Sequence, residues 1–154
     1  MTAETTLRLA HDIPNIIGIK EASGDLEQCM TILKDSPSSF FLTSGDDLLT
    51  IPLIAMGGIG LISVSANALP AQLSQMVRKA LSGNFDEARS IHNQIMNLVQ
   101  LNFQEGNPTG VKLMSEALGL CKGHVRLPLQ KGSGTLLAQM KSELEKLAIK
   151  KRLT

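Results

Sequence analysis

The chain has 154 residues, of which 43% are hydrophobic and 19% are charged, a composition typical of one folded domain and unlike that of a disordered chain. Its net charge of +1 argues against a nucleic-acid partner. The charge-free run 48–77 is broken by proline and glycine, and no secretory signal follows Met1, so we expect a cytoplasmic protein without a membrane span.

The first 67 residues alternate between helical and strand patterns. Strands that are apolar throughout and alternate with helices predict a parallel sheet covered by helices, which is the α/β class. Helices are predicted at 3–11, 25–34 and 48–56, and buried strands at 16–20, 40–43 and 60–64.

The remainder of the chain is predicted to be helical. Helices are expected at 70–81, 84–106, 107–119 and 133–149, with a solvated basic run at 150–152. Cys29 and Cys121 have no metal-ligand spacing and are expected to be buried free thiols in a reducing compartment. The histidines are scattered, so no metal site is predicted.

Polar side chains follow each predicted strand, and Lys20 ends the first one. The carboxyl ends of parallel strands meet at one edge of a sheet, where chemistry is commonly done. A lysine held among apolar side chains there would lose hydration and serve as an amine nucleophile toward carbonyls. The alternative for Lys20 is a structural lysine paired with Glu21 or a loop carboxylate.

The second strand is followed by Gly45, Asp46 and Asp47. Gly45 would let a substrate approach the backbone closely. Asp46 and Asp47 could form a carboxylate pair, but a helix N-cap requires the same residues, and we favour the cap.

Four blocks together resemble the dihydrodipicolinate synthase family of class I pyruvate-dependent aldolases. The blocks are residues 18–25 (GIKEASGD), 44–47 (SGDD), 58–67 (GIGLISVSAN) and 105–108 (EGNP). The first block alone marks only the superfamily, whereas the four in order are more specific to the synthases.

The resemblance implies the C-terminal part of a (β/α)8 TIM barrel, with three parallel strands in residues 1–68 and the last barrel helix plus a helical region in residues 69–154. It implies that Lys20 forms an imine with pyruvate, whose enamine attacks aspartate semialdehyde in lysine and diaminopimelate biosynthesis, without a further cofactor. Ile62, through its main-chain carbonyl, and Gly45 would line the substrate pocket, and Asn107 is a candidate pocket residue. The family also implies a homo-oligomer, usually a tetramer.

The resemblance covers only the last three of eight strands, while a full barrel needs about 250 residues. The family's proton-relay tyrosine has no counterpart, because the chain contains no tyrosine. We therefore expect little or no turnover by this chain alone. Two alternatives stay open: a related sialic-acid or keto-deoxy-sugar lyase, and a non-catalytic, truncated interaction module.

Overall fold

The structure is a computed structural model in which residues 1–147 are described, and these residues form two compact units. The first unit contains Met1–Ser63 and Val77–Ala88, and the second contains Val64–Met76 and the described residues from Arg89 onward. The division predicted between residues 68 and 69 stays a prediction.

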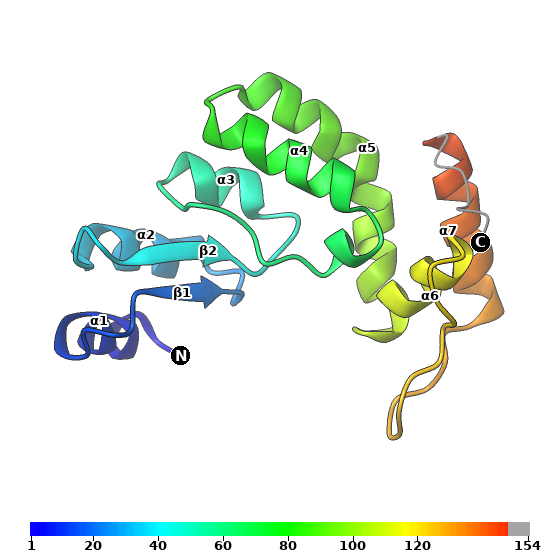
Figure 1. The fold of residues 1–154 in the computed structure, drawn as a ribbon, viewed down its shortest axis with the longest axis horizontal. Helices are drawn as coiled ribbons and strands as arrows, with labels where there is room; N and C mark the ends of the chain where they lie inside the picture. Colours follow the sequence, from blue (N-terminus) through cyan, green and yellow to red (C-terminus); the bar gives the residue numbers. More distant parts are fainter. Residues whose placement is uncertain (148–154) are drawn as a thin grey trace. The chain divides into compact units, whose positions relative to one another are not determined.

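The first unit alternates helices with strands, as predicted (Figure 1). Its first two helices carry side-chain caps: Thr2 accepts from the N–H of Thr5, and Asp25 accepts from the N–H of Gln28. These caps satisfy N–H groups that a helix start leaves without partners. The elements are α1 (Ala3–Asp12), β1 (Gly18–Glu21), α2 (Leu26–Asp35), β2 (Phe41–Ser44) and α3 (Thr50–Ala55).

The two strands pair in parallel, with Gly18 beside Phe41 and Lys20 beside Thr43. The strand predicted at 60–64 is reduced to one parallel bridge between Ser44 and Leu61. Two hydrogen bonds of 2.8 Å flank this bridge, from Ser44 N to Gly60 O and from Ile62 N to Ser44 O. A segment that pairs over so few residues does not form the repeated hydrogen bonds of a strand. The prediction of a third strand at 60–64 is therefore wrong.

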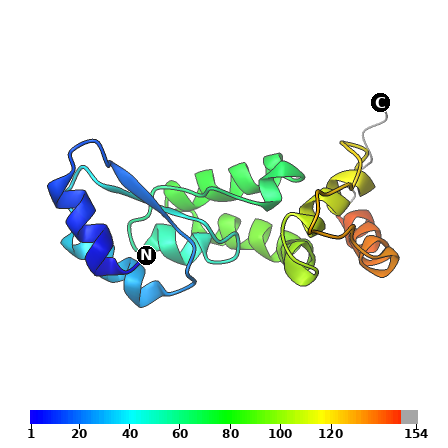
Figure 2. The same ribbon diagram turned by 90° about the horizontal axis from the view of Figure 1, so that it is seen from below.

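Helices cover one face of this sheet. Helices α2 and α3 both contact β2, and Cys29, Ile32, Leu42 and Leu53 form a buried cluster between them. Figure 2 shows α1 and α2 together on one side of the two strands. This side is the hydrophobic core of the first unit.

The opposite face is open, and we call it the lysine face: Gly18, Lys20, Phe41, Thr43 and Ile62. Side chains alternate between the two faces of a strand, so Lys20 and Phe41 point away from the buried Leu42 and Glu21. Phe41 is 43% exposed and Ile62 is 52% exposed.

The expectation of a fully buried first strand is wrong. Ile17 precedes β1 and is 62% exposed, and Lys20 is exposed rather than held among apolar side chains. The physical reason is that the apolar run has a helical cover on one face only.

The second unit is helical. A 3-10 turn at Ser65–Asn67 precedes α4 (Pro70–Leu81) and α5 (Phe85–Gln104), which cross between the units, and then α6 (Thr109–Ala117) and α7 (Gly134–Lys146). These confirm the four predicted helices, with α6 beginning after Pro108. The basic run at 150–152 lies outside the described residues.

The core of the second unit includes a buried polar link. Asn102 is fully buried on α5, and its Nδ2 donates to Ser65 Oγ over 2.9 Å. Gly110 on α6 lies so close to the main chain of Asn102 that a Cβ at this position would overlap it. The glycine therefore permits the close approach of α6 and α5.

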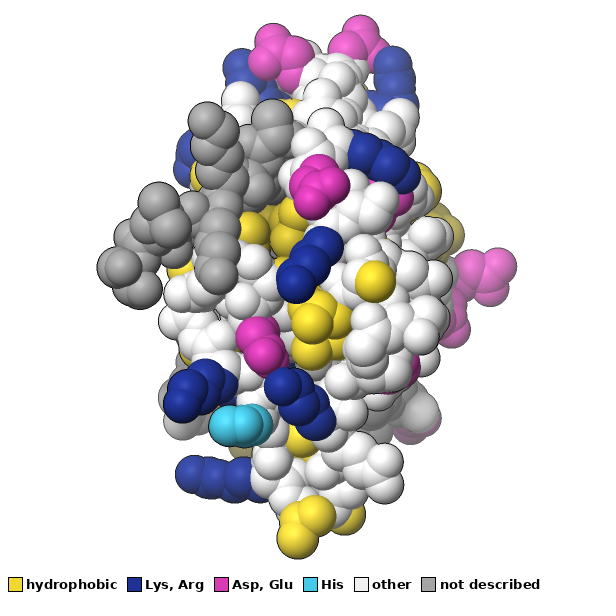
Figure 3. Space-filling model, turned by 90° about the vertical axis from the view of Figure 1, so that its right-hand side faces the viewer, with side chains coloured by type: hydrophobic (Ala, Val, Ile, Leu, Met, Phe, Trp, Pro, Cys, Tyr) yellow, Lys and Arg dark blue, Asp and Glu magenta, His cyan; other side chains and the backbone are white. Residues whose placement is uncertain are grey.

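The two cysteines differ in exposure. Cys29 is buried, but Cys121 is exposed, so the expectation of two buried thiols is wrong for Cys121. In Figure 3, acidic and basic side chains alternate over the visible face, with small apolar patches between them. None of the described helices is long and apolar enough to cross a membrane.

Candidate active site

Lys20 lies at the carboxyl end of β1, on the lysine face, in register with Thr43. Among residues 1–147, no carboxylate forms an ion pair with its ammonium. The alternative in which Lys20 pairs with Glu21 is not seen, because strand alternation places the Glu21 side chain on the opposite, helix-covered face.

Gly45 borders the lysine directly. Its N–H donates to the main-chain oxygen of Glu21 over 2.7 Å, which joins the loop after β2 to the end of β1. A Cβ built on Gly45 would lie 2.7 Å from Lys20 Cε, 3.1 Å from Lys20 Cγ and 2.6 Å from Ala22 Cβ. The absence of a side chain at position 45 therefore leaves the space in which the lysine chain lies.

Ile62 belongs to the same face. Leu61 pairs with the buried Ser44, so the next residue, Ile62, points to the side of Thr43 and Lys20. Its N–H donates to Ser44 O, which fixes the orientation of that peptide. The first unit thus brings together Lys20, Gly45 and Ile62.

The fourth predicted residue, Asn107, is in the second unit, in the turn between α5 and α6. Glu105 anchors this turn by accepting from Ser133 N over 2.8 Å and from Ser133 Oγ. These two hydrogen bonds lower the pKa of Glu105. The pocket role of Asn107 stays a prediction.

The favoured N-cap role for Asp46 and Asp47 is wrong for Asp46: the N-cap position of α3 is Leu49, which has no side-chain cap, and Asp46 instead stabilises the turn before the helix. Its Oδ1 accepts from Leu48 N over 2.8 Å and from Leu49 N over 3.1 Å, in the turn that leads into α3. Its main-chain oxygen accepts from Thr50 Oγ1 and from Ser44 Oγ. Asp46 therefore serves the local fold rather than a paired-carboxylate site.

Sequence reasoning did not identify the role of Glu21 on the helix-covered face. The residue is 6% exposed, and its carboxylate accepts from Ser23 N over 2.6 Å and from Gln28 Nε2 over 2.9 Å. Burial, the largest influence, raises the pKa of Glu21, but the bonds from Ser23 and Gln28 outweigh it and the net pKa is lowered. Strict alternation along β1 was the signal that could have placed Glu21 beside α2.

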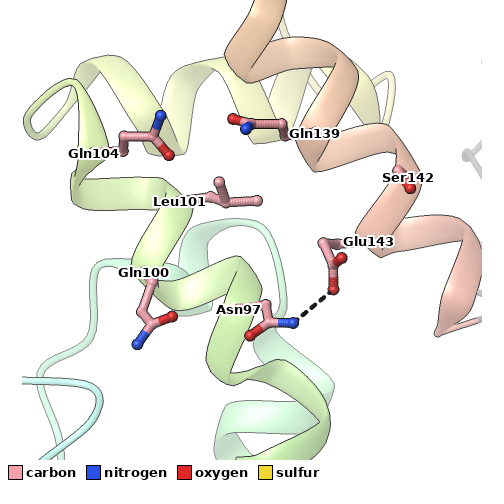
Figure 4. Close-up of a pocket in the computed structure, with 7 residues that line it drawn as sticks. All are labelled: Asn97, Gln100, Leu101, Gln104, Gln139, Ser142 and Glu143. Atoms are coloured by element: carbon pink, nitrogen blue, oxygen red, sulfur yellow. Dashed lines mark hydrogen bonds between the residues drawn. The ribbon is translucent and has the colours of Figure 1, made fainter.

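The part of the chain that the structure describes contains no group of three or more histidine, cysteine and acidic residues arranged to hold a metal ion. A groove of about 510 Å³ lies between α5 and α7 of the second unit, where Asn97 donates to Glu143 over 3.1 Å (Figure 4). It is lined by Asn97, Gln100, Leu101, Gln104, Gln139, Ser142 and Glu143, which include neither a lysine nor a cysteine nucleophile.

Comparison with known proteins gives consistent results. The chain is 49% identical over 150 residues to the 4-hydroxy-tetrahydrodipicolinate synthase of Phocaeicola vulgatus, and 44% identical over 150 residues to that of Parabacteroides distasonis. Each match covers 97% of this chain and 50% of the relative. The chain therefore spans about half the length of the curated relatives that it matches.

Solved structures agree. The dihydrodipicolinate synthase of Aquifex aeolicus superposes with a TM-score of 0.93 at 34% identity, covering 99% of this chain and 52% of that one. The enzyme of Thermotoga maritima gives 0.91 at 32% identity, covering 95% and 50%. The model of the dihydrodipicolinate synthetase family matches residues 1–148. The chain therefore belongs to the dihydrodipicolinate synthetase family.

Proposed function

We propose that Lys20 is the imine-forming lysine of a pyruvate-dependent synthase, and that the first unit supplies the last strands of its barrel. The observation that carries this proposal is the packing of the Lys20 side chain along Gly45 at the carboxyl end of a parallel strand. That edge of a parallel sheet is where barrel enzymes place reacting groups. Membership of the family supports an imine chemistry for this lysine.

The reaction follows from the amine. The neutral Lys20 amine attacks the ketone carbon of pyruvate, a C–N bond forms, and the ketone oxygen leaves as water to give the imine. Loss of a proton from the pyruvate methyl group gives an enamine, whose carbon attacks the aldehyde carbon of aspartate semialdehyde. The iminium nitrogen accepts the electron pair when the methyl proton is lost and gives it back when the new C–C bond forms. Addition of water or an amine to the iminium carbon then breaks the C–N bond to Lys20 and returns the free amine, so the chemistry needs no cofactor beyond the protein's own amine.

The neighbours of Lys20 would form the floor of the pocket. Ile62 presents a main-chain carbonyl near the strand ends, and its N–H bond to Ser44 would hold that peptide still. Gly45 would line the pocket beside the lysine, and the pocket role of Asn107 stays a prediction. Each of these roles is part of the proposal.

We further propose that turnover requires more of the family fold than these 154 residues. The lysine face is open, and Phe41 and Ile62 on it are 43% and 52% exposed. The sequence contains no tyrosine to relay protons. We expect an imine at Lys20 but little turnover from residues 1–154 by themselves, with a homo-oligomer and a cytoplasmic location in the complete synthase.

Reductive trapping tests the proposal. The chain is incubated with pyruvate and borohydride, and the modified peptides are identified by mass spectrometry. We expect modification at Lys20 well above that at Lys34, whose side chain is 80% exposed and serves as an internal reference. Lys20→Arg should remove the selective adduct without unfolding the chain. Equal modification of both lysines, or none, would show that Lys20 is not an imine-forming residue in this chain.

A further inference from the structure

The carboxyl end of β1 is held from both sides by one residue, Glu21. Its main-chain oxygen accepts from Gly45 N over 2.7 Å on the side of the loop that borders Lys20. Its carboxylate, buried on the other face, accepts from Ser23 N over 2.6 Å and Gln28 Nε2 over 2.9 Å. A single residue therefore links the strand end both to the Gly45 loop and to α2.

The carboxylate is part of a wider cap at the start of α2. Ser23 Oγ accepts from Asp25 N over 3.1 Å, and Asp25 Oδ1 accepts from Gln28 N over 3.0 Å. Gln28 is thus fixed through both its main chain and its side chain, and Glu21 is bonded to the fixed side chain. The turn 22–25, which follows Lys20 directly, has little freedom while these bonds hold.

We propose that Glu21 is a positioning residue for Lys20: its buried carboxylate ties the end of β1 to α2 and so holds the lysine against Gly45. The inference rests on the proposed function of Lys20. Glu21 itself faces away from the lysine face and acts through the backbone, so it takes no part in bond making.

The charge of Glu21 matters because both of its carboxylate oxygens accept hydrogen bonds from donors. The bonds from Ser23 and Gln28 favour the ionised form, and charge-assisted bonds are stronger than neutral ones. A glutamine at position 21 could still accept from Ser23 N, and Gln28 would then have to turn its amide over so that its Oε1 accepts from the new NH2 group. Only neutral hydrogen bonds would remain, and the link to α2 would be weaker.

This geometry provides a sharp test by exchange. Glu21→Gln should weaken the link by removing the charge, whereas Glu21→Gln combined with Gln28→Glu restores a charge-assisted bond with the donor and acceptor exchanged. Glu27→Gln is the matched control, because it replaces a carboxylate by an amide in the same way, at an exposed position of α2, the helix to which Glu21 is bonded. Ile32→Val is the stability control, because Ile32 is fully buried under the sheet and does not bond to Glu21.

The readout is the rate of pyruvate–borohydride modification of Lys20 relative to Lys34, measured as a function of pyruvate concentration and pH. All variants are compared well below their unfolding temperatures and at equal helical content. We expect Glu21→Gln to lower the limiting rate at Lys20 by about tenfold, because a small misplacement of a reacting group has large kinetic effects. The exchanged double variant should recover most of that rate, and Glu27→Gln should match the wild type.

Each outcome of this experiment either supports or overturns the positioning role of Glu21. The positioning role would be overturned if Glu21→Gln kept the wild-type ratio of Lys20 to Lys34 modification. It would also be overturned if Ile32→Val, at the same loss of stability, lowered this ratio as much as Glu21→Gln does, because Glu21 would then be only structural. Failure of the double variant to recover would also overturn it. Absence of selective Lys20 modification in the wild type would instead refute the proposed function.

Discussion

Replacing Gly45 by alanine tests whether space beside Lys20 is what the site requires. Gly45 does not lie in the left-handed region of backbone conformation, so alanine is allowed there and only its methyl group matters. That methyl would lie 2.7 Å from Lys20 Cε and 2.6 Å from Ala22 Cβ. Lysine can swing away, but the Cβ of Ala22 is fixed to the backbone.

The size of the effect follows from these distances. Carbon atoms pack at about 3.5–4.0 Å, so the lysine chain and the 44–47 loop must separate by about 1 Å. Overpacking of this kind typically costs about 1–3 kcal/mol, partly offset by the lower entropy of the unfolded chain with alanine. A displacement of about 1 Å at a reacting group lowers rates by up to about a hundredfold. We therefore expect Gly45→Ala to lose about 1–2 kcal/mol of unfolding free energy and nearly all selective modification of Lys20.

The assay pairs urea unfolding with pyruvate–borohydride trapping. Gly134→Ala is the control, because no atom lies within 4 Å of the added methyl group and position 134 begins α7. In Gly134→Ala, Lys20 should be modified at the wild-type rate, and the free energy of unfolding should be unchanged or slightly higher. If Lys20 were also modified at the wild-type rate in Gly45→Ala, the space at position 45 would not shape the site.

Three further results are expected. The folded-state pKa of Glu21 lies below its ordinary value of 4.5. The ionised carboxylate therefore stabilises the fold fully above pH 4.5, and this stabilisation is lost as the pH falls through the folded-state pKa. When the unfolding free energy is measured against pH, it should fall more steeply below pH 4.5 in the wild type than in Glu21→Gln. Asp46→Ala removes the acceptor for two N–H groups before α3 and should cost about 1 kcal/mol in urea unfolding, whereas Asp46→Asn should cost less. Phe41 is 43% exposed on the lysine face, so the chain should self-associate with rising concentration, and Phe41→Ser should shift sedimentation toward the smaller species; an unchanged profile would show that this face does not drive association.

The elements set by local chemistry could be predicted from the sequence. The helices predicted at 3–11 and 25–34 form as α1 and α2 behind the caps Thr2 and Asp25, and α4 has the predicted bounds Pro70–Leu81. Caps and helix starts depend on a few neighbouring residues, so a sequence window contains the information that determines them. The parallel pairing of β1 with β2 was likewise confirmed.

Features that depend on which element packs against a given face of a strand or helix could not be predicted from the sequence. The segment 60–64 has the apolar residues of a strand but forms only one bridge. Both cysteines were expected to be buried, but Cys121 is exposed. For Glu21 the reason is different: its partner Gln28 is seven positions away, and only the packing of α2 on the sheet brings them together. Burial and partner choice are properties of packing, which one chain segment does not encode alone.

The two faces of the sheet separate stability from chemistry. The helix-covered face holds the buried cluster and the ionised Glu21, while the lysine face holds Lys20 beside exposed Phe41 and Ile62. Covering the lysine face would bury this apolar surface and exclude water from the lysine in the same step, since both lie on it. Within the proposed function, completing the fold and completing the site are therefore one event, whereas the position of Lys20 against Gly45 is already set by Glu21 from the other face.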